Sequence, residues 1–280
     1  MVAPALPKDL NDVVARALAE DVGPGDLTAA LVPAGARAEG RIIAREAGVL
    51  AGAPWAEETF RQVDSGVDVH WHVRDGADLA PDAVVCTLDG PARGILTAER
   101  TALNLLQTLS GTATVARRYA DAVKGTGATV IDTRKTLPGL RRAQKYAVAM
   151  GGCGNHRMGL FDFILIKENH IAAAGGVTGA LEAARAQNAG VPIEIEVETL
   201  TQLKEALGAG AERVLLDNFD VDGLREAVGV TAGRAKLEAS GSVDFDQLRA
   251  IAETGVDYIS VGALTKHVHA LDLSLRFTAV

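Results

Sequence analysis

The stretch 132–170 gathers the residues of this chain that are best suited to chemistry. It holds seven lysine and arginine residues against three acidic ones, whereas the whole chain is acidic, with 28 Lys and Arg against 36 Asp and Glu. A concentration of positive charge in an acidic protein favours an anionic ligand, because a low-dielectric cleft focuses the field of its charges. A nucleic acid would need a wider basic surface, so the sequence favours a small polyanion.

The basic residues of this stretch fall into two groups. Arg141, Arg142 and Lys145 have helical spacing, which predicts a solvated helix face. The other four adjoin apolar runs or glycine-rich turns, where an unpaired charge would be costly. These four are Arg134, Lys135, Arg157 and Lys167. We interpret them as ligand-binding residues, with His156 beside them, because arginine presents a fork that matches carboxylate or phosphate oxygens.

Six apolar runs alternate with helical segments in the second half of the chain. They are ATVIDT (128–133), FDFILIK (161–167), IEIEVE (193–198), RVLLDN (213–218), KLEAS (236–240) and YISVG (258–262). Repeated βα units predict a parallel sheet with right-handed crossovers. Every run ends on a polar residue or a glycine, and such strand ends carry the active site of β/α barrels. We therefore predict a β/α barrel rather than a doubly wound sheet, whose site would lie at one switch point.

Two carboxylates, Glu196 and Asp217, lie at the ends of neighbouring runs. Carboxylates so placed can hold Mg²⁺, although they could instead pair with the cations of the site. Glu194 lies deeper in its run and could orient neighbouring side chains. The turns EASGS (238–242) and SVGA (260–263) follow the last two runs, and their exposed N–H groups predict a phosphate site.

The first half of the chain has a different pattern. Three β runs with little helix between them, at 39–52, 67–73 and 83–88, predict an antiparallel sheet. A long helix is predicted over 97–122, with Thr97 as its N-cap and Gly111 as a break. Arg100, Asn104 and Gln107 follow at i, i+4 and i+7 and form a polar stripe on this helix.

The composition predicts a globular cytoplasmic protein. Two cysteines, Cys86 and Cys153, cannot build a disulfide framework and suit a reducing compartment. The first ten residues lack the pattern of a signal peptide. No apolar stretch reaches the length of about 18 residues that a membrane span needs.

An ordered set of motifs resembles the quinolinate phosphoribosyltransferase family almost from end to end. The motifs are AEDVGPGDLT (19–28), ERTALNLLQTLSGTAT (99–114), DTRKTLPGLR (132–141), GGCGNHRMGL (151–160), LIKENH (165–170), EIEVE (194–198), LLDN (215–218), EASG (238–241) and VGALTKHVHALDLSL (261–275). The whole set is far more specific than any one piece. Two positions depart from the family pattern, namely Cys153, in a turn often written GGG, and Ser242, where Gly or Asn is common.

The resemblance implies a reaction and a role for each site residue. The family transfers the phosphoribosyl group of phosphoribosyl pyrophosphate to quinolinate with decarboxylation, using Mg²⁺, and gives nicotinate mononucleotide in NAD biosynthesis. The implied quinolinate ligands are Arg100, Thr133, Arg134, His156, Arg157 and Lys167. Lys135, Glu196 and Asp217 are implied as catalytic residues, the two carboxylates also as metal ligands. The implied phosphoribosyl pyrophosphate and phosphate ligands are Lys135, Ser240, Gly241, Ser242, Val261, Gly262 and Ala263.

The resemblance also implies an α/β fold of two domains. Residues 1–110 would form an α/β sandwich with an antiparallel sheet, on which the tail 268–280 packs. Residues 111–267 would form an incomplete, seven-stranded TIM-like barrel, one strand more than the six runs above. The family assembles as homodimers with shared active sites, which allows a hexamer of such dimers, and binds neither nucleic acid nor membrane.

Three other functions are compatible with parts of the sequence. A paralogue of the same fold could act on another small acid. A Schiff-base aldolase could use Lys167 at its strand end. A non-catalytic sensor of a phosphorylated ligand would leave the pair of Glu196 and Asp217 without a purpose.

Overall fold

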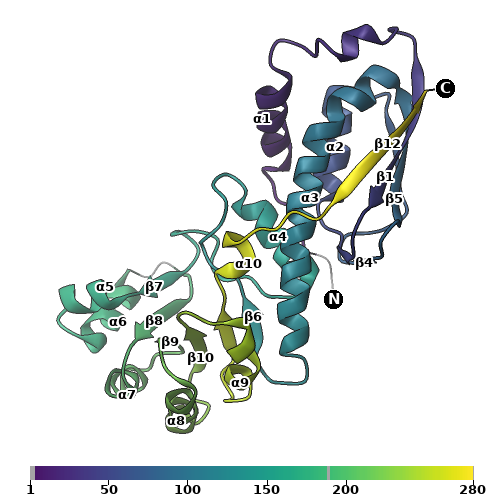
Figure 1. Ribbon diagram of the computed structural model, residues 1–280. Helices are drawn as coiled ribbons and strands as arrows, with labels where there is room; N and C mark the ends of the chain where they lie inside the picture. Colours follow the sequence, from purple (N-terminus) through teal and green to yellow (C-terminus); the bar gives the residue numbers. More distant parts are fainter. Residues whose placement is uncertain (1–3, 188–189, 280) are drawn as a thin grey trace. The chain divides into compact units, whose positions relative to one another are not determined.

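The computed structural model describes residues 4–187 and 190–279 and divides into two compact units. The first unit is formed by the described residues of Met1–Arg118, Thr136–Gly152 and Ala263–Val280, and the second by those of Tyr119–Lys135 and Cys153–Gly262. Each unit is an α/β structure with its own main sheet (Figure 1). No helix among the described residues combines the length and the apolar character that a membrane span requires.

The first unit is built on a four-stranded antiparallel sheet. Its strands lie in the order β12 (Leu273–Ala279), β1 (Arg37–Ala44), β5 (Val84–Pro91) and β3 (Asp68–Trp71). Buried and exposed residues alternate along β1, so that one face of the sheet is buried and the other is open. The antiparallel sheet predicted for the first half is confirmed, and its fourth strand comes from the far end of the chain (Figure 1).

Helices cover the buried face of this sheet. Ile42 of β1 and Leu88 of β5 share one core with Phe60 of α2 (Ala53–Val63) and Leu106 of α3 (Ala92–Ala122). A second core joins α1 (Leu10–Val22) to α3 and to α4 (Arg141–Gly151). The shorter elements of this unit are η1 (Ala29–Leu31), β2 (Gly48–Val49), β4 (Asp78–Leu79) and α10 (Ala263–Lys266).

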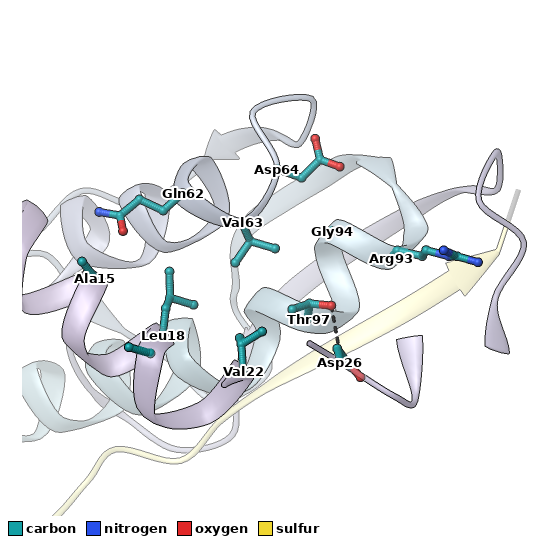
Figure 2. A pocket seen from close by; sticks show the side chains of 11 residues that line it. Ala15, Leu18, Val22, Asp26, Gln62, Val63, Asp64, Arg93, Gly94 and Thr97 are labelled. Carbon is teal, nitrogen blue, oxygen red and sulfur yellow. Dashed lines mark hydrogen bonds between the residues drawn. The ribbon is translucent and has the colours of Figure 1, made fainter. Parts of the chain in front are cut away.

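The long helix α3 differs from its prediction at two points. It begins at Ala92, so Thr97 is not its N-cap. The Thr97 hydroxyl instead donates to Asp26 at 2.9 Å, beside a hollow of about 600 Å³ that α1, α2 and α3 line (Figure 2). Gly111 does not break the helix. A Cβ atom there would lie 1.9 Å from the carbonyl oxygen of His269, so glycine allows the C-terminal segment to approach.

The prediction of a solvated face on α4 is wrong for Lys145, whose residue is only 1% exposed. Arg142 is exposed, and its guanidinium lies 3.6 Å from Asp9. All residues from 143 to 148 are buried, because α4 is covered on more than one side. Gln144 is buried with its polar atoms engaged, accepting from the Leu137 N–H and donating to the Thr265 carbonyl. Helical spacing of charges therefore does not identify the solvent side of a helix that lies in a core.

The second unit is built on a six-stranded parallel sheet, in the order β6, β11, β10, β9, β8, β7. The strands are β6 (Thr129–Ile131), β7 (Ile164–Ile166), β8 (Ile193–Val197), β9 (Arg213–Asp217), β10 (Lys236–Ser240) and β11 (Tyr258–Ser260). The helices are α5 (Glu168–Ala173), α6 (Val177–Ala186), α7 (Leu200–Gly208), α8 (Val221–Thr231) and α9 (Leu248–Ala252), with the turn η2 (Phe245–Gln247). All six predicted barrel strands are thus confirmed.

The position of a seventh strand is filled by a single bridge. Gly154 pairs in parallel with Ile131 on the edge of β6, where its N–H donates to Val130 and its carbonyl accepts from Asp132. Glycine is suited to this site, since a Cβ atom would lie 3.0 Å from the Ile131 side chain. Within the described residues no ladder joins this bridge to β7, so the barrel is incomplete, as predicted.

Candidate active site

Six strand ends place the predicted site residues of the second unit at one edge of its sheet. Because the strands are parallel, their carboxyl ends meet at the same mouth. Thr133 and Arg134 follow β6, Lys167 follows β7, and Glu196 lies near the end of β8. Asp217 and Ser240 are the last residues of β9 and β10, and Val261 and Gly262 follow β11. Arg100 and Ala263 belong to the first unit, where Arg100 is exposed on α3.

Lys167 and Glu196 form an ion pair at this mouth. The Lys167 ammonium lies 2.7 Å from a Glu196 oxygen, and the Glu196 side chain is only 9% exposed. Burial raises the pKa of Glu196, as does the charge of Asp217, while Lys167 acts in the opposite direction. The two carboxylates therefore lie near enough to repel each other. A cation bound between them would relieve that repulsion.

Asp132 fixes the segment that carries His156. Its carboxylate is fully buried and accepts from the backbone N–H of His156 at 2.9 Å and from the Asn155 amide at 2.8 Å. Together with the bridge at Gly154, these hydrogen bonds fix the backbone from Gly154 to His156. Asp132 received no role in the sequence analysis, although an acidic residue directly after an apolar strand is a signal for one.

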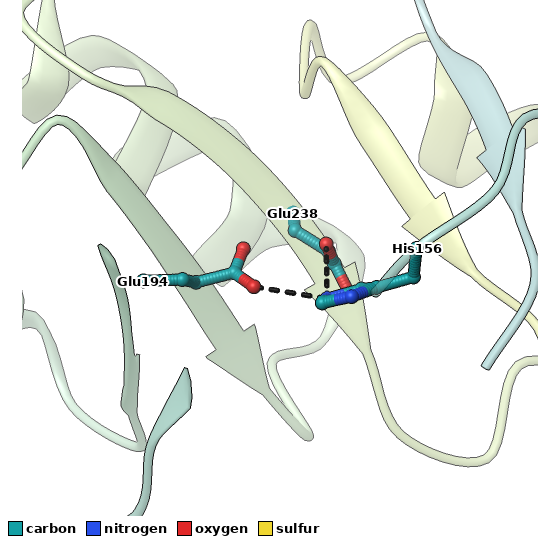
Figure 3. Close-up of side chains that lie close together, drawn as sticks. All are labelled: His156, Glu194 and Glu238. Atoms are coloured by element: carbon teal, nitrogen blue, oxygen red, sulfur yellow. Dashed lines mark hydrogen bonds and ion pairs between the residues drawn. The ribbon is translucent and has the colours of Figure 1, made fainter. Parts of the chain in front are cut away.

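His156 points into a buried cluster of charges. Its Nε2 atom lies 3.0 Å from a Glu194 oxygen and 3.5 Å from a Glu238 oxygen (Figure 3). Its Nδ1 atom accepts the Arg157 backbone N–H at 2.6 Å. Since Nδ1 accepts, Nε2 carries the proton and donates to Glu194. Both ring nitrogens thus have protein partners, and the histidine positions Arg157.

Arg213 neutralises this cluster. Its Nε donates to Glu194 at 2.7 Å and its Nη2 to Glu238 at 2.6 Å, and the guanidinium lies over the Tyr258 ring at 4.3 Å. Both carboxylate side chains are fully buried. A histidine with two carboxylates could hold a metal ion. Here the guanidinium already supplies the positive charge that the two carboxylates need.

The two carboxylates of the cluster titrate differently. Burial and the charge of Glu194 raise the pKa of Glu238 to about 7. Burial acts on Glu194 in the same direction, but the His156 hydrogen bond and the Arg213 charge outweigh it and lower the pKa of Glu194. Two acids that share one guanidinium do not ionise independently, so Glu194 holds the negative charge first. Sequence analysis missed Arg213 and Glu238, although charged residues inside apolar strands indicate a buried pair.

Arg157 lies half-buried beside Arg134. Burial lowers the pKa of Arg157, and so does the positive charge of Arg134. The loop after Arg157 is held by Asp162, whose carboxylate accepts from the N–H groups of Met158 and Gly159 at 2.7 and 2.9 Å. The half-buried guanidinium of Arg157, with its lowered pKa and the charge of Arg134 nearby, would be stabilised by a bound anion.

Two glycines at the mouth occupy positions where a side chain would meet its neighbours. Gly262 lies beside Lys135, and a Cβ atom there would be 3.1 Å from the Lys135 side chain. Gly241 has a φ of 132°, and its Cβ would lie 2.6 Å from the Asn218 side-chain oxygen. Asn218, which sequence analysis did not single out, donates to Asp217 at 2.8 Å and so orients it. Ser240 is half-buried, whereas Gly241 and Ser242 are exposed.

Together, the incomplete β/α barrel and its mouth of opposed charges define a barrel protein with a site for anionic ligands. The chain matches "Quinolinate phosphoribosyl transferase, C-terminal domain" over residues 112–276 and the corresponding N-terminal domain over residues 26–110. It therefore belongs to the quinolinate phosphoribosyltransferase family.

Individual relatives are similar to this chain over nearly its whole length. The nicotinate-nucleotide pyrophosphorylase (carboxylating) of Mycobacterium leprae is 48% identical over 273 residues, which cover 95% of this chain and 96% of that protein. A probable nicotinate-nucleotide pyrophosphorylase of Bacillus subtilis is 44% identical, with 92% and 90% covered. The solved structure of the Francisella tularensis nicotinate-nucleotide pyrophosphorylase superposes with a TM-score of 0.95 at 44% identity, and 98% of each chain is covered.

Proposed function

We propose that this chain transfers the phosphoribosyl group of phosphoribosyl pyrophosphate to the ring nitrogen of quinolinate, with loss of the 2-carboxylate. The products are nicotinate mononucleotide, pyrophosphate and CO₂, in the biosynthesis of NAD. The observation that carries this proposal is the barrel mouth, where the charge of Arg134 acts on the half-buried Arg157 and the carboxylates Glu196 and Asp217 lie at adjacent strand ends. The relatives named nicotinate-nucleotide pyrophosphorylase support the same reaction.

The direct test is the release of CO₂ from carboxyl-labelled quinolinate, with and without phosphoribosyl pyrophosphate and Mg²⁺. We expect release only when all three are present. Nicotinate and nicotinamide serve as competing acceptors, and a preference for either would instead favour a paralogue acting on another small acid. Lys167 offers little support for an aldolase, because its amine is engaged in an ion pair with Glu196.

On the quinolinate side, Thr133, Arg134, Arg157 and Lys167 would bind the two carboxylates. His156 would act indirectly, since its ring accepts the Arg157 N–H and holds the backbone of that arginine in place. This modifies the role that the family resemblance implies for the histidine. Binding energy from the carboxylates orients the ring nitrogen toward the ribose, and such positioning is the main contribution of the protein to the rate.

On the phosphoribosyl pyrophosphate side, the donor set fits Mg²⁺. Glu196 and Asp217 offer hard oxygen atoms at adjacent strand ends, and their repulsion raises the pKa of Glu196 in addition to the effect of burial. Bound Mg²⁺ would neutralise the charge of the departing pyrophosphate. Lys135 would add positive charge to the same group. The turns at Ser240–Ser242 and Val261–Ala263 would hold the 5-phosphate with backbone N–H groups.

The two chemical steps then follow. As pyrophosphate departs, positive charge develops on the ribose, and the carboxylates at the strand ends stabilise it. After the new bond to nitrogen forms, the electron pair of the breaking carbon–carboxylate bond moves into the positively charged pyridinium ring. A proton replaces the lost carboxylate at the same carbon. The arginine pair that bound the carboxylates keeps the ring fixed through both steps.

We expect Asp217→Asn to raise the Mg²⁺ concentration needed for half-maximal activity. The change keeps the shape of the side chain and removes its charge, and a hard cation prefers an anionic oxygen. The measurement is a Mg²⁺ titration of initial rates. Asp222→Asn is the matched control, because Asp222 is exposed on α8 and pairs with Arg225. An unshifted Mg²⁺ dependence would show that Asp217 is structural.

We also propose a homodimer in which Arg100 completes the active site of the neighbouring subunit. Its exposure on α3 leaves it accessible to a second chain. A two-fold interface uses the same surface of both subunits, so Arg100 of each subunit would lie at the active site of the other. Arg100→Ala and Lys135→Ala homodimers should each be nearly inactive. In a hybrid of the two, one site carries both changes and the other carries none.

Mixing the two variants tests this arrangement. Random exchange makes about half the dimers hybrids, so roughly a quarter of wild-type activity should return. Exchange is verified independently with differently tagged chains. Proven exchange without recovered activity would mean that Arg100 acts in its own subunit or binds no substrate.

A cytoplasmic location is consistent with the two free cysteines, for which burial raises the pKa to about 12.

A further inference from the structure

Arg213 lies at the end of the barrel opposite the mouth. It is the first residue of β9, whereas the predicted site residue Asp217 is the last. Side chains four residues apart on a strand project from the same face and are about 13 Å apart, so Arg213 lies well below Asp217. Its partner Glu194 likewise precedes Glu196 by two residues on β8. Active sites of β/α barrels lie at the carboxyl ends of the strands, so position alone would assign Arg213 to stability.

The contacts of Arg213 lead from this end of the barrel to Arg157. The Nε atom of Arg213 donates to Oε1 of Glu194 at 2.7 Å, and Oε2 of the same carboxylate lies 3.0 Å from Nε2 of His156 (Figure 3). On the other side of the imidazole, Nδ1 accepts the backbone N–H of Arg157 at 2.6 Å. Three hydrogen bonds in series thus join the Arg213 side chain to the backbone of Arg157.

These three hydrogen bonds select one ring state of His156. A neutral imidazole has one N–H donor and one acceptor nitrogen, and a carboxylate accepts hydrogen bonds. Nε2 therefore carries the hydrogen, and Nδ1 keeps the lone pair that the Arg157 N–H needs. In the other tautomer, a ring N–H would face the N–H of Arg157, and two donors form no hydrogen bond. The contact with Arg157 thus depends on the orientation of the Glu194 carboxylate, which Arg213 fixes through Oε1.

Phe163 provides a second connection between Arg213 and Arg157. Its ring centroid lies 5.2 Å from that of His156 and 5.4 Å from the guanidinium carbon of Arg213. A guanidinium at such a distance over an aromatic ring is attracted to it. The Phe163 carbonyl accepts from Nη1 of Arg157 at 3.4 Å. A residue in contact with Arg213 therefore also holds the guanidinium of Arg157.

We infer that Arg213 is a positioning residue for the binding of quinolinate, which it serves by holding Arg157 in place. The route to the backbone of Arg157 runs through Glu194 and His156, and the route to its guanidinium runs through Phe163. The inference rests on the proposed function, in which Arg157 binds a carboxylate of quinolinate. Arginine suits this role, because its planar fork orients a carboxylate while its flat face packs on an aromatic ring.

Arg213→Lys tests the inference, because lysine keeps the positive charge beside the buried carboxylates and loses the fork. An ammonium cannot both orient Glu194 and pack flat on Phe163. We expect the dissociation constant of quinolinate to rise roughly 10-fold or more, since a small displacement of a binding group is costly. The dissociation constant of phosphoribosyl pyrophosphate should stay unchanged, because its proposed ligands do not include Arg157. Titration calorimetry with each substrate separately measures both constants.

Val214→Ala is the matched control. Val214 is the next residue on β9, is fully buried and projects from the other face of the strand. Its truncation should lower the resistance to urea and leave the affinity for quinolinate unchanged. Glu194→Asp is the second test variant, for the case that Arg213→Lys folds poorly. It keeps the charge and withdraws the carboxylate by one methylene from His156, so the same selective loss of quinolinate affinity is expected.

The ring state of His156 provides a readout that needs no substrate. Nitrogen-15 spectra of the free protein at mildly alkaline pH should show Nε2 protonated and Nδ1 unprotonated in the wild type. The signals are assigned by their absence in His156→Gln. Arg213→Lys should give a mixture of the two tautomers, whereas Val214→Ala should keep the wild-type signals.

The outcomes separate this inference from the proposed function. If the wild type binds quinolinate, and Arg213→Lys and Glu194→Asp bind it equally well, the inference is wrong and the proposed function stands. Equal losses of affinity for both substrates, or an equal loss for quinolinate in Val214→Ala, would make Arg213 a stabilising residue and overturn the inference. A wild type that shows the expected ring state but binds no quinolinate would refute the proposed function, and with it the role of Arg213 in that function.

Discussion

Arg157→Ala is expected to abolish measurable quinolinate binding and to leave the binding of phosphoribosyl pyrophosphate largely intact. The side chain is half-buried at the mouth of the barrel, and loss of a charged hydrogen bond in such a site costs on the order of 2–5 kcal/mol. The dissociation constant should therefore rise by roughly 30-fold to several thousandfold. Titration calorimetry with each substrate separately measures both effects.

Arg225→Ala is the matched control for this change. Arg225 is an exposed arginine on α8 that pairs with Asp222, so its removal should alter neither substrate affinity. Arg157→Lys separates charge from geometry, because lysine keeps the charge and loses the fork that binds a carboxylate with two bonds. An unchanged quinolinate affinity in Arg157→Ala would remove this arginine from the proposed site.

Arg213→Ala is expected to cost about 3–5 kcal/mol of the free energy of unfolding. The change removes the guanidinium that binds both Glu194 and Glu238 and leaves two fully buried carboxylates without it. Removing one partner of a buried ion pair destabilises a protein far more than replacing all of the charged partners together with uncharged residues. Urea denaturation at pH 8, above the pKa of about 7 of Glu238, measures the loss with both carboxylates ionised.

A compensated variant distinguishes this explanation from a simple loss of packing. Arg213→Met with Glu194→Gln and Glu238→Gln removes all three charges and keeps most of the volume, so it should recover most of the stability. Arg234→Ala is the control, because Arg234 donates to the backbone carbonyls of Thr231 and Val230 and not to a buried carboxylate. If the compensated variant were as unstable as Arg213→Ala, charge burial would not be the cause.

The strands of the barrel could be predicted because each is a short apolar run between helical segments. The run 193–198 corresponds to β8 (Ile193–Val197), and the run 213–218 to β9 (Arg213–Asp217). The start of α3 could not be found, because Ala92 follows Pro91 without a capping residue and the helix is fixed by its packing. The open seventh position of the barrel could not be predicted either, since a one-residue bridge produces no periodic pattern in the sequence.

The charged residues of the mouth could be predicted from their positions at strand ends, but their pairings could not. Lys167 and Glu196 were assigned to different ligands, and the structure brings them into one ion pair. The cluster around His156 joins a loop with β8, β9 and β10. Residue spacing within one strand cannot predict a contact that involves three strands. Lys145 shows the same limit in the first unit, because only tertiary packing decides which side of a helix is covered.

The strands of the barrel form a ring with one gap in its ladder hydrogen bonds, which lies between β7 and the single bridge at Gly154 and is called the seam here. In a closed ring, every displacement of one strand breaks ladder hydrogen bonds on both of its sides. Across the seam between β7 and Gly154 no such ladder exists in the described residues, and the loop that follows Gly154 is held by the side chains of Asp132 and Asp162. The side chain of His156 also ties this loop to the buried Glu194 of β8, so side-chain bonds and not a strand ladder fix the loop. Arg157 lies in that loop, so the position of the residue proposed to hold the substrate depends on these side-chain bonds.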